Sequence, residues 1–193
     1  MIKHLARTLL AAVFCLATAS PTLAGIVTLN IQWFGIENSA TATGFITFDD
    51  TGLPEVGSQT FFSLPNANVI DLGITISGAS DGNGTFGMAD FSNFFFAAPS
   101  ALDLSQELIG QLLTNGCNFG TSTGPCGDGN GGDFNLFGST LGAPTGTWYF
   151  QLTTAGGEHM LVTSMVTAAP EPASLLLLAL GLAGLGFSRR RKA

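Results

Sequence analysis

The segment Ile70-Asp71-Leu72-Gly73-Ile74-Thr75-Ile76-Ser77 alternates without interruption between apolar residues and small or polar ones. Successive side chains of a β-strand point to opposite faces, so this period of two predicts a strand that buries its isoleucines and its leucine on one face. The turn-forming cluster Ser80-Asp81-Gly82-Asn83-Gly84 follows the segment and is expected to close the strand. The pattern therefore indicates the all-β class.

The chain on both sides of this strand carries similar patterns. Val27 to Trp33 alternate apolar with polar residues, and 41–48 do so up to the turn signal Asp49-Asp50-Thr51-Gly52. Residues 85–96, crowded with phenylalanine, predict a further strand or a bent pair of strands. Later strands, of which the last two are joined by a glycine loop suited to a hairpin, are expected at 134–137, 147–153 and 159–167.

One helix is expected among the strands. Its apolar stripe would be formed, at helical spacing, by Leu104, Leu108, Ile109 and Leu112. Ser100 or Asp103 can cap its start, and Asn115-Gly116 can end it. Repeated short strands, abundant glycine and threonine, and a single helix together predict an antiparallel β-sandwich of jelly-roll type.

Charge is divided unevenly along the chain. All six Lys and Arg residues lie before position 8 or after position 188. Of the thirteen acidic residues only Glu171 belongs to the tail, so the body between the two ends carries twelve acids and no Lys or Arg. Such a body cannot neutralise phosphates, which excludes nucleic acid as a partner. Its carboxylates must instead be compensated by backbone amides, hydroxyls or bound cations.

Cys117 and Cys126 are the two cysteines of the body. They stand nine positions apart in a loop rich in Gly, Asn, Thr and Pro. In an exported chain such a pair predicts one disulfide. Two cysteines and the single His159 are too few for a structural zinc site.

The best candidate for a metal site is Asp128, Asn130 and Asp133. In the loop that contains them, carboxylate and amide oxygens recur at the spacing by which a tight loop wraps calcium, and 81–85 is a shorter version of the same pattern. Both loops depart from an EF-hand loop, which has a Gly at its sixth and a Glu at its twelfth position. A plain turn is therefore the alternative in each case, and calcium is the only cofactor that the sequence suggests.

Catalytic constellations are missing from the sequence of the body. His159 is its only histidine and no Gly-x-Ser-x-Gly is present, which argues against a serine hydrolase. A glycosidase needs only two carboxylates roughly 5 to 9 Å apart, but no pair stands out. We therefore expect a protein that is not an enzyme, with a polysaccharide-active enzyme as the less favoured alternative.

Three aromatic residues could serve a carbohydrate-binding module. Trp33, Trp148 and Tyr149 would be natural platforms for sugar rings if two of them were exposed. Because all three fall in segments that alternate like strands, we expect them in the core instead.

Residues 1–24 have the form of a secretory signal peptide. Lys3 and Arg7 precede an apolar run, and Thr22-Leu23-Ala24 provides small residues for cleavage before Gly25. Export through the Sec machinery is therefore expected.

The other end of the chain has three parts. Pro170-Glu171-Pro172 precedes the apolar stretch 173–187, which a basic cluster follows, formed by Arg189, Arg190, Arg191 and Lys192. As a helix, at about 1.5 Å per residue, the apolar stretch would cover roughly 22 Å. This is short of the hydrocarbon core of about 30 Å and suits a temporary membrane anchor. The positive-inside rule places the basic end in the cytoplasm.

These three parts, in this order and at this distance from the C-terminus, resemble the PEP-CTERM sorting signal of Gram-negative bacteria that make exopolysaccharide. The resemblance implies that an exosortase, a membrane-embedded cysteine transpeptidase, cuts at or near Pro170-Glu171-Pro172. It also implies that the body passes from an inner-membrane-anchored precursor to the cell surface or the extracellular matrix. An ordinary short anchor that is never processed is the alternative.

The expected organisation is a signal peptide at 1–24, one exported β-sandwich domain at 25–169 and the sorting signal at 170–193. The expected function is that of a non-enzymatic surface or matrix protein associated with exopolysaccharide. A calcium- or carbohydrate-binding module is the alternative.

Overall fold

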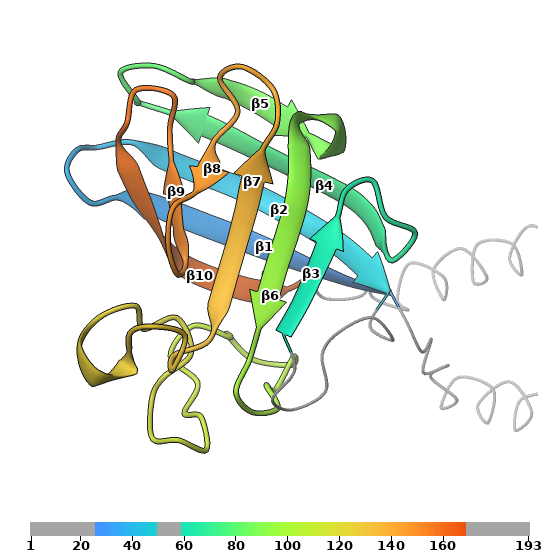
Figure 1. The fold of residues 1–193 in the computed structure, drawn as a ribbon, viewed down its shortest axis with the longest axis vertical. Helices are drawn as coiled ribbons and strands as arrows, with labels where there is room; N and C mark the ends of the chain where they lie inside the picture. The colour runs from blue at the N-terminus through green and yellow to red at the C-terminus, as the bar shows by residue number, and fades with distance from the viewer. Residues whose placement is uncertain (1–25, 50–58, 169–193) are drawn as a thin grey trace, which may run out of the picture.

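Two antiparallel sheets pack face to face in the computed structural model, which describes residues 26–49 and 59–168 (Figure 1). The larger sheet has the strand order β5-β4-β2-β1-β10-β9-β8, and the smaller has the order β3-β6-β7. In Figure 1 the smaller sheet lies in front and its strands cross those of the larger sheet steeply. The predicted all-β, sandwich-like fold is therefore confirmed.

The strands are β1 (Ile26–Gly35), β2 (Thr41–Asp49), β3 (Gln59–Ser63), β4 (Val69–Ser77), β5 (Gly84–Gly87), β6 (Phe91–Ala97), β7 (Asp133–Gly138), β8 (Thr145–Gly146), β9 (Gln151–Thr153) and β10 (His159–Thr167). Within the described residues the helical segments are two 3-10 turns, η2 (Met88–Asp90) and η3 (Gly124–Cys126).

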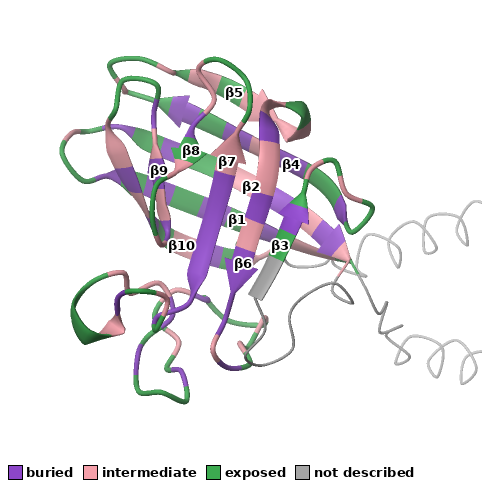
Figure 2. Cartoon of the chain, in the orientation of Figure 1, coloured by how far each residue is buried: buried purple, intermediate pink, exposed green. Residues whose placement is uncertain are grey.

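Alternation of apolar and polar residues creates the inner face of the larger sheet. Leu29, Ile31 and Trp33 of β1 are buried, and the residues between them are exposed. Figure 2 shows the resulting stripes of buried and exposed residues along β1, β2 and β4. The side chains predicted to face inward on β1 therefore do so, and their burial holds the sheets together.

Single-residue bulges shift this alternation in three strands. In β4 two residues oppose one residue of β2 next to Thr47, so Ile70 becomes the extra residue. Val69 and Leu72 point into the core as a result, and Ile70 is 48% exposed. The prediction that Ile70 shares the buried face of its strand was wrong. Ser92 of β6 and Thr163 of β10 are the extra residues of the other two bulges.

A sharp corner connects the two sheets. β5 pairs with β4 in the larger sheet, and β6 pairs with β3 and β7 in the smaller one. Between them the carboxylate of Asp90 accepts hydrogen bonds from the Gly87 amide and the Thr140 hydroxyl. Residues 85–96 thus form the bent pair of strands that their sequence suggested.

The helix predicted from Leu104, Leu108 and Leu112 is not formed, and that prediction was wrong. The three leucines would share one helix face. In the structure Leu108 is fully buried, but Leu112 is 75% exposed and its neighbour Leu113 is buried instead. This part of the chain consists of turns and isolated bridges.

Local hydrogen bonds explain why turns replace the helix. Gly110 has a φ of 94°, which a helix cannot contain. The side chain of Gln111 bonds the backbone N–H and C=O of Asp103 and the C=O of Glu107. The Asp103 carboxylate accepts from Ser105. Side chains that bond nearby backbone in this way compete with helical hydrogen bonds.

The strand predicted at 147–153 is present only at Gln151–Thr153, because a turn precedes it. Phe150 has a φ of 60°, in the left-handed region, and the Gln151 amide donates to the Trp148 carbonyl. The reversal buries Phe150 and leaves Trp148 exposed. The hairpin predicted between this strand and the last one is confirmed, since β9 pairs with β10.

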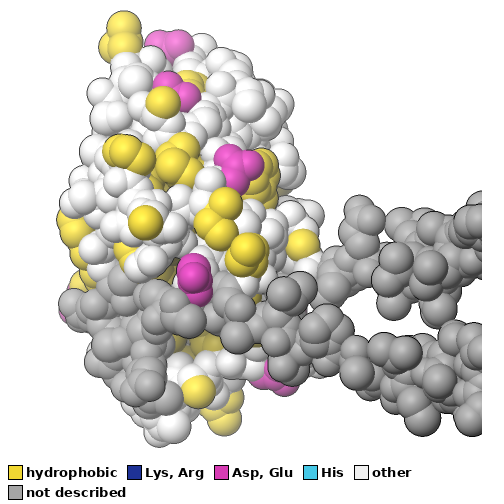
Figure 3. All heavy atoms as spheres, turned by 90° about the vertical axis from the view of Figure 1, so that its right-hand side faces the viewer, with side chains coloured by type: hydrophobic (Ala, Val, Ile, Leu, Met, Phe, Trp, Pro, Cys, Tyr) yellow, Lys and Arg dark blue, Asp and Glu magenta, His cyan; other side chains and the backbone are white. Residues whose placement is uncertain are grey.

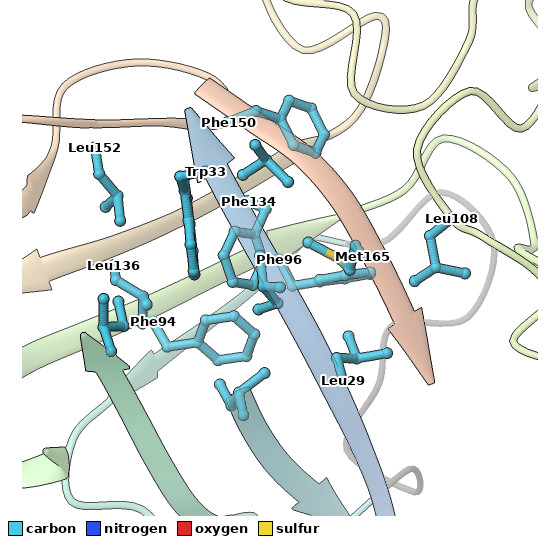
Figure 4. Close-up of a cluster of buried hydrophobic side chains, with 14 of the residues drawn as sticks. Leu29, Trp33, Phe94, Phe96, Leu108, Phe134, Leu136, Phe150, Leu152 and Met165 are labelled. Atoms are coloured by element: carbon cyan, nitrogen blue, oxygen red, sulfur yellow. The ribbon is translucent and has the colours of Figure 1, made fainter. Parts of the chain in front are cut away.

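Aromatic rings fill the space between the sheets (Figure 4). Phe134 is in ring contact with Phe94 at 5.5 Å and with Trp33 at 6.3 Å. Phe119 meets Phe150 edge to face at 5.0 Å, which fixes the long loop before β7 to the sandwich. Trp33 is 2% exposed, so its predicted place in the core is confirmed.

Candidate functional site

The residues of the sorting signal lie outside the part of the chain that the structure describes. This applies to Pro170, Glu171, Pro172, Arg189, Arg190, Arg191 and Lys192. The predicted signal peptide and the apolar stretch before the basic cluster also lie outside it. Among the described residues, no helix is long and apolar enough to cross a membrane.

The structure contains the disulfide predicted from the cysteine spacing. Cys117 and Cys126 are joined, with their Cα atoms 5.5 Å apart. The Cys117 carbonyl accepts from the Leu113 amide, and the Cys126 carbonyl accepts from the Gly131 amide. The disulfide therefore closes a loop whose ends are also held by backbone hydrogen bonds.

The three residues proposed for calcium lie in different surroundings. Asp128 is exposed at a turn, with a φ of 52°. The Asn130 carboxamide donates to the carbonyl of Pro125. Asp133 is buried at the start of β7. Among the described residues, no three His, Cys, Asp or Glu side chains come together so that they could hold a metal ion.

Asp133 is the most perturbed carboxyl of those described. Burial raises its pKa to about 6, although the backbone amides of Phe134 and Phe150 donate to it and oppose the rise. The side-chain carboxamide of Asn135 donates from Nδ2 to Asp133 at 2.6 Å, and the Oδ1 of Asn135 has no hydrogen-bond partner. Gly146 of β8 approaches Asn135 closely, and the Phe150 amide donates to Asp133, so β8 and the chain that follows it cover this pair of β7 residues.

A shallow depression lies on the solvent face of the larger sheet, which we call the outer face. Its cavity volume is about 340 Å³. Uncharged residues of four neighbouring strands line it: Asn30, Ile31, Gln32, Thr43, Gly44, Phe45, Gly73, Ile74, Thr75 and Thr85. The hydroxyl groups of Thr75 and Thr85 bond each other at 3.0 Å.

Phe45 provides the aromatic surface of this depression. It pairs across strands with Gly73, and a side chain at Gly73 would lie 2.9 Å from the phenyl ring. Glycine at that position leaves room for the ring to lie over the backbone of β4. The depression thus combines one partly exposed ring with hydroxyl and carboxamide groups.

A second group of aromatic and apolar side chains lies beside the depression on the outer face. Strand register places Phe34 of β1 opposite Leu161 of β10, which is opposite Gln151 of β9. Trp148 lies next to this row, because its indole N–H donates to Gln151 and its ring stacks on His159 at 6.1 Å. Phe34 is 53% exposed and Trp148 is 58% exposed. The expectation that Trp148 lies in the core was therefore wrong.

The imidazole of His159 contacts the carboxylate of Glu37, and this is the one histidine–carboxylate contact within ion-pair distance among the described residues. The Nδ1 of His159 lies 2.9 Å from Glu37, and the His159 amide donates to the same carboxylate. The hydrogen bond from the His159 ring, with the one from its amide, lowers the pKa of Glu37. His159 thus serves to orient Trp148 and to hold Glu37.

The sequence alone did not point to the outer face as a site. The outward positions of each strand follow from alternation, but Phe34 is far from Leu161 and Gln151 in the chain and meets them only through strand pairing. Tyr149, the third proposed sugar platform, is partly buried against Gly129.

On the face drawn in Figure 3, hydrophobic and acidic side chains are scattered among neutral ones, and no described basic side chain is visible.

A family model described as the PEP-CTERM protein-sorting motif matches residues 168–192. No curated protein and no solved structure matches the chain. The matched segment contains the Pro-Glu-Pro tripeptide, the apolar stretch and the basic cluster on which the resemblance rested. The motif implies export, a membrane-anchored precursor and processing by an exosortase. The chain therefore carries a PEP-CTERM protein-sorting motif at residues 168–192.

Proposed function

We propose that this protein is a non-enzymatic component of the cell surface or extracellular matrix of a Gram-negative bacterium, associated with exopolysaccharide. The sorting motif at 168–192 carries this proposal. In the proposed route the Sec machinery exports the chain, and the tail anchors it in the inner membrane with its C-terminus in the cytoplasm. The exosortase then releases the body at or near Pro170-Glu171-Pro172.

The composition of the body supports a role outside the cell. It has no Lys or Arg, and its two cysteines are paired in a disulfide, as is usual for exported proteins. After removal of both ends the protein would be strongly acidic, which favours solubility. Its β-sandwich would present sheet faces and loops to the matrix.

Mass spectrometry of the protein recovered from the cell surface tests the sorting route. We expect neither the basic cluster nor the intact apolar stretch in the recovered protein. Replacing Pro170, Glu171 and Pro172 together by alanine should keep the protein in the membrane fraction. The matched control is Ser174→Ala, which changes the tail but not the tripeptide. A full-length C-terminus on the surface-exposed protein would contradict the route.

Association with the matrix is tested separately. Exopolysaccharide isolated from the producing strain should contain the processed protein, and a strain that lacks the polysaccharide should release the protein into the medium. Equal release by both strains would show that the protein is exported but is not held by exopolysaccharide.

Calcium binding at Asp128, Asn130 and Asp133 is the second candidate function. The observation that favours it is the absence of Lys and Arg from a body with twelve carboxylates, which leaves bound cations as one of the few sources of compensation. The calcium dependence of thermal stability tests this candidate.

A further inference from the structure

We propose that the outer face of the larger sheet binds an uncharged polysaccharide, with Phe34 and Trp148 as stacking platforms. This inference rests on the proposed association with exopolysaccharide and adds the site and the chemical class of polymer. It is supported by the arrangement, the chemistry and the charge of the residues on that face.

The arrangement is that of a continuous strip across the sheet. Strand register aligns Ser77, Thr41, Phe34, Leu161 and Gln151 in one row on the outer face. A neighbouring row contains Thr85, Thr75, Thr43 and Gln32, which belong to the depression. Adjacent strands lie about 4.8 Å apart, so five strands form a strip of roughly 20 Å. A strip of this length suits an extended chain of several sugar units better than a single small molecule.

The chemistry of the strip suits sugar rings. Threonine, asparagine and glutamine side chains both donate and accept hydrogen bonds, as sugar hydroxyls do. Exposed aromatic rings offer a face to the C–H groups of a sugar. The depression supplies the first kind of group and Phe45, whereas the adjoining corner supplies Phe34 and Trp148.

Trp148 is held in place before any ligand arrives. Its N–H donates to Gln151, and its ring stacks on His159, which Glu37 holds in turn. An exposed ring with a fixed orientation loses little conformational entropy on binding. Intramolecular contacts of this kind distinguish Trp148 from an exposed aromatic residue that is merely unpacked.

Charge selects the class of polymer. The residues that line the depression are uncharged. The carboxylates of Glu37, Asp71 and Glu107 lie near the strip, and each accepts hydrogen bonds within the protein. The body carries twelve acids and no Lys or Arg. It would therefore repel a polymer rich in uronate or sulfate, so the polymer that fits is neutral.

The test uses the full-length chain in nanodiscs, with empty nanodiscs as the blank. Affinity electrophoresis is run against four neutral polymers, dextran, hydroxyethyl cellulose, galactomannan and starch, and against polygalacturonate as the acidic polymer. We expect retardation by at least one neutral polymer and none by polygalacturonate. Phe34→Ala and Trp148→Ala should each weaken binding about tenfold or more, as the loss of a stacking ring predicts.

The matched control is Phe61→Ala. Phe61 is 57% exposed, close to the exposure of Phe34, but lies on β3 of the other sheet. The affinity of the Phe61→Ala variant for the neutral polymer should stay within about twofold of that of the unmodified chain. As a second readout, the neutral polymer should protect Trp148 from acrylamide quenching, since the only other tryptophan, Trp33, is buried.

Three results would overturn the assignment. The first is that the protein binds none of the neutral polymers. The second is that Phe34→Ala and Phe61→Ala lose polymer affinity equally. The third is that Phe34→Ala changes only the oligomeric state, which would make the outer face a contact between copies of the chain. Failure of the outer face as a binding site is distinguishable from failure of the proposed matrix function. If the protein stays in the matrix when Phe34 and Trp148 are replaced, the matrix role stands and the outer face is not the site.

Discussion

Asp133 links the stability of the sandwich to pH at the scale of a single residue. Burial raises the pKa of this carboxyl from an ordinary value of 3.8 to about 6. A carboxyl whose pKa is higher in the folded than in the unfolded protein favours folding while it is protonated in both states. That contribution is fully present below about pH 4 and is lost as the pH rises through 6.

Asp133→Asn should therefore stabilise the protein at pH 8 by about 1 to 2 kcal/mol and leave it nearly unchanged at pH 4. The side chains are nearly isosteric, but the carboxylate accepts from the Asn135 carboxamide and from the Phe134 and Phe150 amides. Asparagine keeps only one accepting oxygen for these donors, so the gain in stability is smaller than the pKa shift alone would give. Urea unfolding at a series of pH values measures the difference.

Asp128→Asn is the matched control for this experiment, because it removes one negative charge at an exposed position of the same loop. If both variants gained the same free energy of unfolding at pH 8, the stabilisation would come from the change in net charge and not from the burial of Asp133.

At the scale of elements, the segment around Glu107 protects an open sheet edge. β9 pairs only with the first part of β10. Beyond it, the Leu108 amide donates to the Met165 carbonyl, and the Glu107 carboxylate accepts from the Met165 amide and the Ser164 hydroxyl. Burial alone would raise the pKa of Glu107, but the hydrogen bonds to its carboxylate from Ser164, Met165, Ile109 and Leu108 outweigh burial and lower the pKa. Covering an edge in this way prevents pairing with other chains.

We predict that Glu107→Ala lowers the free energy of unfolding by about 1 to 2 kcal/mol, since it leaves the Met165 amide without its acceptor. Gln106→Ala, at the exposed neighbouring position, should change it by less than about 0.5 kcal/mol. Chemical denaturation measures both, and light scattering tests whether the uncovered edge promotes association. Equal stability of the two variants would mean that the segment does not protect β10.

The disulfide gives a second prediction at this scale. Alkylation of the denatured, unreduced body should leave Cys117 and Cys126 unlabelled. Replacing both by serine should cost about 2 to 3 kcal/mol, because the closed loop restricts the unfolded chain. Cys15, the third cysteine of the precursor, provides a positive control for labelling while the predicted signal peptide is still attached. Labelling of both body cysteines in the exported protein would contradict the prediction.

At the scale of the whole molecule, charge repulsion is the dominant electrostatic feature. No Lys or Arg lies within residues 26–49 and 59–168, and the contact of His159 with Glu37 is the one within ion-pair distance found there. Several carboxylates are instead satisfied by hydroxyl and amide donors, as Glu158 is by Thr154 and Ser80. The side-chain hydrogen bond from Thr154 lowers the pKa of Glu158, and the bonds from Ser80 add to this effect.

We predict that the melting temperature rises with ionic strength, because salt reduces repulsion over about 10 Å at 0.1 M. Thermal denaturation in increasing sodium chloride tests this. If calcium binds at Asp128, Asn130 and Asp133, millimolar calcium should raise the melting temperature beyond sodium chloride of equal ionic strength.

The control for calcium is the double variant Asp128→Asn with Asp133→Asn. Each protein is compared with itself with and without calcium, since Asp133→Asn also removes the burial cost described above. The double variant should lose the increment that is specific for calcium and keep the general salt effect. Equal shifts with calcium and sodium in the unmodified chain would exclude the site, and no shift with either would refute the repulsion argument.

Features that depend on local pattern and composition could be predicted from the amino-acid sequence. Alternation identified β1, β2 and most of β4 with their inward residues, the cysteine spacing predicted the disulfide, and the tail predicted the sorting motif. These features need only neighbouring residues or counts. Strand periodicity acts within a few residues, and a sorting signal is read as a linear segment.

Contacts between residues that are distant in the chain depend on the packing and pairing of the strands. The bulge at Ile70 and the left-handed Phe150 each change which side chains face the core, and neither follows from a local pattern. The turns around Gly110 replaced a helix because side chains and the edge of β10 compete for the same backbone groups. Strand pairing brought Phe34 beside Leu161, because hydrogen bonds between strands, and not distance along the chain, set the composition of a sheet face.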